Sequence, residues 1–183
     1  MTKDWKRLMS NIRIRKLVFS ALFAALCCGA TMVIKFPTPM GGYVHAGDAV
    51  VLLGAFLLGP GWGAFAAGLG SALADILAGY MIYAPATLVI KAVMAITAGL
   101  LLNSMGLRRP NPSAFIAGLV SGLVMVAGYF LYGCFVLGLG LAAAADIPLN
   151  LLQGVFGAAA GAALFSALLK TPYMKQVFGQ SEK

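Results

Sequence analysis

The polar residues best placed to bind a small molecule lie on one face of the last apolar segment. Asp146, Asn150 and Gln153 occupy positions i, i+4 and i+7, which share one side of an α-helix. Amide side chains within an apolar segment need hydrogen-bond partners, and a polar ligand can supply them. We therefore predict that Asn150 and Gln153 contact a ligand, while Asp146 belongs either to the same site or to the cap of the helix.

A second set of charged residues lies on two neighbouring apolar segments. Asp75 belongs to the segment 62–79 and Lys91 to the segment 85–103. A turn at 80–84 joins the two segments, and counting residues from that turn puts Asp75 and Lys91 at depths that differ by about 4–5 Å. Because a lysine stem reaches this far, we predict an Asp75–Lys91 ion pair. The pair is either structural or part of a ligand site in which Asp75 orients Lys91.

The other ionisable residues outside the basic clusters lie near the same ends of the segments. His45 fits a solvated loop as well as a site, and Asp48 fits a helix cap as well as a site. Tyrosines concentrate there too, at positions 43, 80, 83, 129 and 132. They fit either an interfacial aromatic belt or a stacking wall for a planar ligand, and Tyr83 and Tyr129 are our candidates for stacking.

The composition indicates which elements position these residues. Of the 183 residues, 61% are hydrophobic and 10% are charged, whereas soluble domains have about 25% charged residues. This excludes a soluble globular domain and a disordered chain, and it predicts an all-α membrane protein. The net charge of +8 does not indicate nucleic-acid binding, because the basic residues cluster in short segments beside the apolar ones.

We expect a single integral membrane domain with six transmembrane helices. A span needs about 20 apolar residues, and Gly59-Pro60-Gly61 divides a stretch that is too long for one helix. The predicted spans are 17–35, 46–60, 62–79, 85–103, 113–136 and 146–169. The remainder of the long uncharged stretch before residue 146 is expected to form an outer loop or a short interfacial helix.

The basic residues predict how these spans are oriented. Six of them lie in the tail 1–16, Arg108 and Arg109 follow the fourth span, and Lys170 and Lys175 follow the sixth. With six spans all these clusters lie on one side of the membrane, which the positive-inside rule identifies as the cytoplasm. We therefore predict cytoplasmic N and C termini, with the candidate site at the outer side.

Several kinds of chemistry are not expected from this sequence. It has no GxxxxGK[ST] phosphate-binding loop and contains one His, which argues against a multi-His metal site. Its three cysteines lie within apolar segments, as packing residues do. We expect no metal, no cofactor and no catalytic residues, and so no enzyme.

The sequence resembles a known family, the substrate-binding S components of energy-coupling factor (ECF) vitamin transporters, and within it the riboflavin-type subgroup. The matching stretches are GYVHAGDAV at 42–50, LGP at 58–60, GSALAD at 70–75, YAPAT at 83–87 with Lys91, and PLNLLQ at 148–153. Together they extend over about residues 15–170, and as a set they are more specific than any one of them alone.

The resemblance implies a fold and a lid. It implies an S-component-like bundle of six helices with an outward pocket that the loop between the first two spans covers. The lid would then be the loop 35–46, and the residues assigned to it are Lys35, Tyr43, His45 and Asp48. Beneath it, the resemblance agrees with the substrate site inferred above from Asp75, Lys91, Asn150 and Gln153.

The resemblance also implies partners and a location. The partners are a membrane coupling subunit and two cytoplasmic ATPases in the plasma membrane of a prokaryotic-type cell. In that family an Ala-x-x-x-Ala motif on the first helix contacts the coupling subunit, and Ala21 and Ala25 match it. On the residues alone, this small-residue spacing fits either packing within the bundle or docking to a partner.

We therefore expect a protein that binds a B-type vitamin or vitamin precursor with high affinity and imports it. Riboflavin is slightly favoured over pyridoxine-like and hydroxymethylpyrimidine-like compounds, because the resemblance is to the riboflavin-type subgroup. The alternative is a self-sufficient small membrane transporter or channel that needs no ATPase partner.

Overall fold

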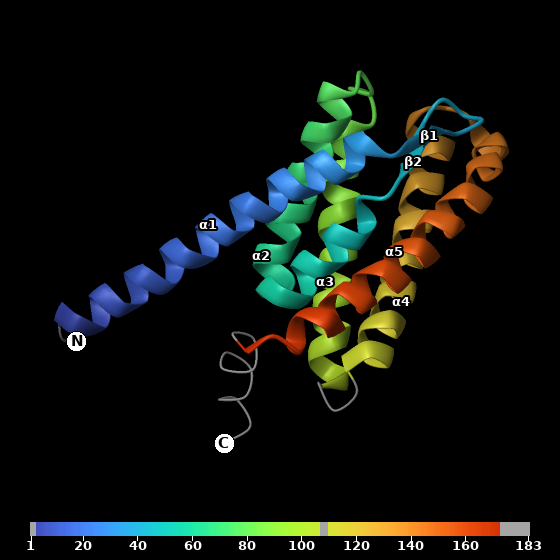
Figure 1. Cartoon of the computed structure of the whole chain (residues 1–183). Helices are drawn as coiled ribbons and strands as arrows, with labels where there is room; N and C mark the ends of the chain where they lie inside the picture. Colours follow the sequence, from blue (N-terminus) through green and yellow to red (C-terminus); the bar gives the residue numbers. More distant parts are fainter. Residues whose placement is uncertain (1–2, 107–109, 173–183) are drawn as a thin grey trace.

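The computed structural model describes residues 3–106 and 110–172, with side chains from Arg13 onwards. Over these ranges the chain forms five long helices, one short hairpin and two short irregular helices (Figure 1). The long helices are α1 Lys3–Val33, α2 Asp48–Leu77, α3 Ala84–Met105, α4 Pro110–Leu131 and α5 Ile147–Leu169. Strand β1 Lys35–Pro37 pairs antiparallel with β2 Tyr43–His45, and the irregular helices are η1 Tyr132–Val136, of π type, and η2 Gly140–Asp146, of 3₁₀ type.

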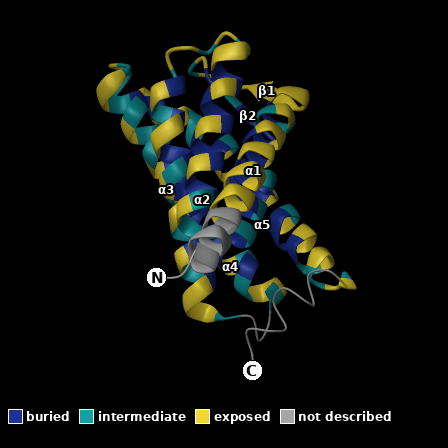
Figure 2. Ribbon diagram, turned by 90° about the vertical axis from the view of Figure 1, so that its left-hand side faces the viewer, coloured by how far each residue is buried: buried dark blue, intermediate teal, exposed yellow. Residues whose placement is uncertain are grey.

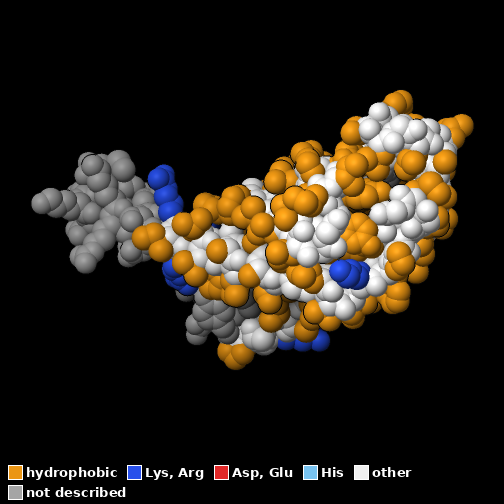
Figure 3. Space-filling view, turned by 90° about the horizontal axis from the view of Figure 1, so that it is seen from above, with side chains coloured by type: hydrophobic (Ala, Val, Ile, Leu, Met, Phe, Trp, Pro, Cys, Tyr) orange, Lys and Arg blue, Asp and Glu red, His pale blue; other side chains and the backbone are white. Residues whose placement is uncertain are grey.

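All five long helices have the length and hydropathy of membrane spans. A helix satisfies its own backbone hydrogen bonds, which is what the hydrocarbon region of a bilayer requires. Large apolar side chains such as Leu26, Leu88 and Leu152 are exposed on the outside of the bundle. Figure 3 shows hydrophobic side chains over most of the visible face, with Lys and Arg in only a few places. The prediction of a helical multi-pass membrane protein is confirmed.

The second helix is broken where the sequence predicts a division between two spans. Gly59 has φ 81° and ψ 174°, a backbone conformation that residues with a Cβ rarely adopt, and Pro60 follows it. The two halves fold back on one another, because a Cβ added to Gly63 would lie 2.6 Å from the Cα of Ala55. In a straight helix residues 55 and 63 would be about 12 Å apart. Figure 1 shows α2 reversing its direction at this point.

Five helices qualify as spans by length and hydropathy, and α2 consists of two halves that fold back on one another. The count of six spans stays a prediction. The cytoplasmic location of both termini stays a prediction. The basic residues Arg108, Arg109 and Lys175, on which that prediction depends, lie outside the described residues.

Two element boundaries differ from the sequence predictions. Helix α1 begins at Lys3, so it extends through the basic tail that was expected to precede the first span; lysine and arginine are good helix formers. Helix α4 begins at Pro110 and ends in the π-helical turn η1, which the sequence did not indicate. The 3₁₀ helix η2 is the short helix expected before the last span.

The core lies between α2, α3, α4 and α5, whereas α1 packs against α2 at the side of the bundle. Figure 2 shows that α1 exposes most of its outer surface. The few large side chains that are fully buried include Leu52, Met94 and Phe165. Small residues let the backbones approach, as where a Cβ on Gly122 of α4 would meet Gly154 of α5 at 3.2 Å.

Three connections lie at one end of the bundle. They are the β1–β2 hairpin (residues 35–45), the turn at 78–83 between α2 and α3, and the η1–η2 segment (Figure 1). Strand β2 contacts both α1 and α5. This end therefore brings together residues that are more than 100 positions apart in the sequence.

Candidate ligand-binding site

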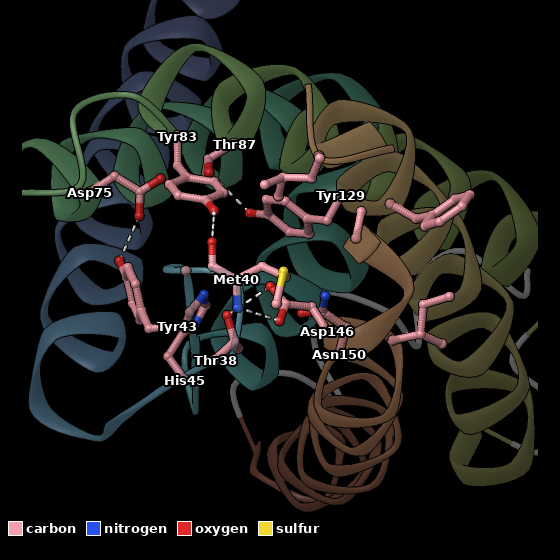
Figure 4. A pocket seen from close by; sticks show the side chains of 16 residues that line it. Thr38, Met40, Tyr43, His45, Asp75, Tyr83, Thr87, Tyr129, Asp146 and Asn150 are labelled. Carbon is pink, nitrogen blue, oxygen red and sulfur yellow. Dashed lines mark hydrogen bonds between the residues drawn. The ribbon is translucent and has the colours of Figure 1, made fainter. Parts of the chain in front are cut away.

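A pocket lies at this end of the bundle, beneath the β1–β2 hairpin (Figure 4). The space within it is about 600 Å³, part of which is open to solvent. The hairpin, both ends of the α2–α3 turn, α4, the η1–η2 segment and α5 all contribute to its lining. The predicted site residues that line it are Tyr43, His45, Asp75, Tyr83, Tyr129, Asp146 and Asn150.

Asp75 and Tyr43 form one side of the pocket. The Tyr43 hydroxyl donates a 2.6 Å hydrogen bond to Oδ1 of Asp75, which is 4% exposed. Burial, followed by this hydrogen bond, raises the pKa of Tyr43 well above its usual value. The phenol therefore stays protonated and acts as a donor, which ties the hairpin to the end of α2.

Asp146 ties the tip of the hairpin to the start of α5. Its Oδ2 accepts a 2.8 Å hydrogen bond from the Thr38 hydroxyl and its Oδ1 a 3.0 Å bond from the backbone N–H of Met40. Asp146 lies at the cap position of α5 but makes no side-chain capping bond. The carboxylate is therefore used to hold the hairpin rather than to cap the helix.

Both predicted stacking tyrosines also make polar contacts. The Tyr83 hydroxyl donates to the carbonyl oxygen of Met40 at 3.2 Å, a further contact between hairpin and bundle. Burial, with the nearby Asp146 carboxylate, raises the pKa of Tyr83, so this phenol too is protonated. The hydroxyls of Tyr129 and Thr87 are 3.0 Å apart and share a hydrogen bond. Their rings leave apolar faces toward the pocket (Figure 4).

The predicted Asp75–Lys91 ion pair is wrong, because Lys91 forms its ion pair with Asp48. Both side chains are 0% exposed. The ammonium group of Lys91 also lies 3.0 Å from Sδ of Met125 and 5.7 Å from the centre of the Tyr129 ring. A buried ion pair needs additional hydrogen bonds to offset its loss of hydration, and these neighbours provide part of that environment. Lys91 lies beside the pocket and does not line it.

Gln153 connects the buried ion pair to the hairpin. Its Nε2 donates to Oδ2 of Asp48 at 2.8 Å, and its Oε1 accepts from the backbone N–H of His45 at 2.7 Å. Both ends of the amide are thus satisfied by protein groups. Gln153 does not line the pocket, so its predicted contact with substrate stays a prediction, as does that of Lys91.

His45 is a buried member of the hairpin rather than a solvated loop residue. It is 8% exposed, and its Nδ1 accepts a 3.0 Å hydrogen bond from the backbone N–H of Gly47. Burial, together with the positive charge of Lys91, lowers its pKa to about 4. The imidazole is therefore neutral at physiological pH.

The other two residues assigned to the lid differ in position. Asp48 is the first residue of α2 and pairs with Lys91, so it does not lie in the hairpin. Lys35 begins β1 and therefore belongs to the hairpin; it is exposed, with its ammonium group 5.9 Å from the centre of the Tyr43 ring. It does not line the pocket.

Asn150 is a predicted ligand residue whose side chain remains available. It is 8% exposed and lines the pocket. In the part of the chain that the structure describes, no hydrogen bond engages its side-chain amide. Its two hydrogen-bonding ends are therefore open to a ligand.

The predicted docking motif lies away from this pocket. Ala21 and Ala25 are exposed on α1, and a Cβ added to Gly29, one turn further on, would meet no atom within 4 Å. The small residues therefore form an open stripe rather than a packed one. Their contact with a coupling subunit stays a prediction.

Sequence reasoning missed several residues of the site. Thr38 and Met40, which belong to the hairpin, donate hydrogen bonds to Asp146. Met125 contacts both Lys91 and Gln153. Hydropathy and helical spacing carry no signal for a backbone donor in a loop or for a methionine among many. Thr87 did have a signal, because it is four residues before Lys91 on the same helical face.

The comparisons with known proteins cover most of the chain. The family model for the ECF-type riboflavin transporter, S component, matches residues 11–170. An uncharacterized protein of Pyrococcus woesei is 37% identical over 142 residues, which are 76% of this chain and 92% of that protein. The thiamine precursor transporter HmpT of Lactococcus lactis subsp. cremoris is 30% identical over 153 residues, which are 82% of this chain and 86% of that protein.

The family match covers more than half of the chain and agrees with the helical membrane fold and with the pocket at one end of the bundle. S components are parts of transporters and not a class of enzyme. This chain belongs to the family of S components of ECF-type riboflavin transporters.

Proposed function

We propose that this protein captures a B-type vitamin or vitamin precursor in the pocket beneath the β1–β2 hairpin and delivers it across the plasma membrane. The observation that carries the proposal is the hairpin itself, which lies over a pocket with polar side chains and is attached by Asp75, Asp146 and Gln153. Every one of these attachments is a hydrogen bond, so they can break and re-form as ligand enters and leaves. The family to which the chain belongs supports the same role.

Delivery requires an energy source that we assign to partners. We propose a membrane coupling subunit and two cytoplasmic ATPases of an ECF module, with Ala21 and Ala25 on the docking surface. The exposed stripe of small residues on α1 supports this assignment because such stripes allow close helix contact.

Two kinds of compound are candidates for the captured vitamin. The family description favours riboflavin, and the similarity to HmpT favours a thiamine precursor such as a hydroxymethylpyrimidine. Both are planar heterocycles that tyrosine faces can accommodate.

The test is a calorimetric titration of the purified, detergent-solubilised protein with a panel of B vitamins and precursors. We expect tight one-to-one binding of one compound in the absence of ATP and of partners. No binding across the panel would contradict the proposal. Vitamin uptake by the isolated chain in liposomes, without ATPases, would instead support a self-sufficient transporter.

A further inference from the structure

One carboxylate oxygen of the pocket lacks a partner. Asp75 is 4% exposed and uses Oδ1 to accept the hydrogen bond from Tyr43, but Oδ2 is buried and has no hydrogen-bond partner among the described residues. The Thr87 hydroxyl lies near this carboxylate, but among the described residues its hydrogen bond is with Tyr129. Buried acceptors are nearly always satisfied, so an unsatisfied one in a ligand pocket indicates a missing donor.

A second unused polar group lies across the pocket. The Asn150 amide has no hydrogen bond within the described residues, and Figure 4 shows Asp75 and Asn150 on opposite sides of the cavity. Figure 4 shows the rings of Tyr83 and Tyr129 next to each other along one side of the cavity. A flat molecule that lies against these rings would present one edge to Asp75 and another to Asn150.

The charges of the lining restrict this molecule further. The ionisable side chains that line the pocket are those of Asp75, Asp146, His45 and three tyrosines. His45 is neutral at physiological pH because burial lowers its pKa to about 4, and the protonated phenols carry no charge. Lys91 lies outside the lining and is paired with Asp48. Among the described residues, the pocket lining thus contains acidic groups and no cationic group. It therefore repels an anionic ligand.

We propose that Asp75 is a specificity-determining residue whose Oδ2 accepts a hydrogen bond from an amino group or ring N–H of the captured heterocycle. Asn150 pairs with the opposite edge of the same ring system. The ligand class is then an uncharged or cationic nitrogen heterocycle, and phosphorylated or carboxylated compounds are rejected. This inference rests on the proposed function and adds the chemistry of the substrate to it.

The first experiment changes the ligand and leaves the protein intact. Two matched pairs are titrated calorimetrically: 4-amino-5-hydroxymethyl-2-methylpyrimidine against its analogue without the 4-amino group, and riboflavin against N3-methylriboflavin. For the compound that binds, we expect loss of the donor to weaken affinity about 10- to 100-fold, as for a hydrogen bond to a charged group. The phosphate ester of the same compound should show no measurable binding.

The second experiment changes the acceptor. Asp75→Ala removes it, and Asp75→Asn keeps its shape but replaces one of the two acceptor oxygens with an N–H donor, so we expect affinity to fall about 10- to 100-fold in both. Ser71→Ala is the matched control, because Ser71 lies one turn away on the same helix, is buried and does not line the pocket. It should leave affinity unchanged.

The outcomes separate this inference from the proposed function. If the wild-type protein binds a vitamin tightly while both the donor-lacking analogue and Asp75→Ala match the original affinity, the role of Asp75 is refuted and the proposed function stands. Equal binding of the phosphate ester would refute the exclusion of anions. If the wild-type protein binds no member of the panel, the proposed function fails and this inference fails with it. The ligand pairs decide the question even if an Asp75 variant does not fold.

Discussion

Gln153 of α5 accepts a hydrogen bond from the backbone N–H of His45 at 2.7 Å, across 108 positions of sequence. The same amide donates to Asp48, the partner of Lys91 in a fully buried ion pair. One side chain thus joins the hairpin over the pocket to the charged centre beside it. The position of the hairpin is therefore coupled to the integrity of that centre.

Replacing Gln153 should loosen the hairpin. Gln153→Leu leaves the His45 N–H and one oxygen of Asp48 without their partners, which costs about 1–3 kcal/mol for each buried group. We expect a lower melting temperature and faster dissociation of bound vitamin, measured by stopped-flow fluorescence. Ser166→Ala is the control on the same helix, since the Ser166 hydroxyl is buried and has no hydrogen-bond partner among the residues that the structure describes. An unchanged dissociation rate in Gln153→Leu would contradict the coupling.

Removing one charge of the buried Lys91–Asp48 pair should lower the free energy of unfolding more than removing both charges. Lys91→Met leaves Asp48 buried without a counter-charge, and we expect a loss of about 3–5 kcal/mol in the free energy of unfolding. The double variant Lys91→Met with Asp48→Asn removes the uncompensated charge and should recover part of this loss. The melting temperatures of the four proteins of this cycle are the measurement. Additive effects would show that the two residues are not coupled.

The buried imidazole of His45 predicts a dependence of stability on pH. Its pKa is lowered from 6.5 to about 4 in the folded protein, so between these values the unfolded chain binds a proton that the folded chain does not. The contribution of His45 to the free energy of unfolding is then fully present above pH 6.5 and is lost as the pH falls toward 4. From pH 7.5 to pH 5 we expect this group to lower the free energy of unfolding by about 2 kcal/mol.

Thermal unfolding of the ligand-free protein at several pH values tests this. His45→Asn keeps an acceptor for the Gly47 N–H but does not titrate in this range, so its profile should be flatter than that of the wild type. Parallel profiles for the two proteins would show that His45 does not carry the effect.

The exposed stripe on α1 predicts a separation of binding from transport. Replacing Ala21 and Ala25 together with leucine should leave vitamin affinity unchanged, because neither residue lines the pocket, and should abolish ATP-dependent uptake. Ala159 and Ala163 provide a matched control, since they are an exposed pair with the same spacing on α5. Uptake that survives the α1 substitutions, or that is lost equally in the α5 control, would contradict docking through α1.

Much of the fold could be predicted because its determinants are local. Long apolar runs define helices in a membrane, and Gly59 followed by Pro60 breaks one of them at a position that can be read directly. The candidate site was partly predictable for the same reason. Asn150 and Asp75 stand out as polar residues within apolar helices, and both line the pocket.

The wrong prediction concerns which side chains contact one another, and not which segments form helices. Lys91 was paired with Asp75 on the basis of depth along two helices, but depth does not fix the rotation of a helix about its axis or the identity of its neighbours. Asp48 begins α2, and a Cβ on Gly157 of α5 would lie 2.8 Å from its Cβ, so the close approach of α5 helps to place Asp48 in the bundle. Nothing in the spacing of Asp48 indicates this.

From the sequence alone, one can predict a helical membrane protein, the break in α2 at Gly59, and the gathering of its rare polar residues near one end. These properties follow from hydropathy and turn chemistry over neighbouring residues. The packing of the helices sets the remaining contacts: Lys91 pairs with Asp48, Asp146 and Gln153 hold the hairpin, and Asp75 and Asn150 keep unused hydrogen-bonding groups. Such choices depend on distances between residues far apart in the chain, which are set when the helices pack together.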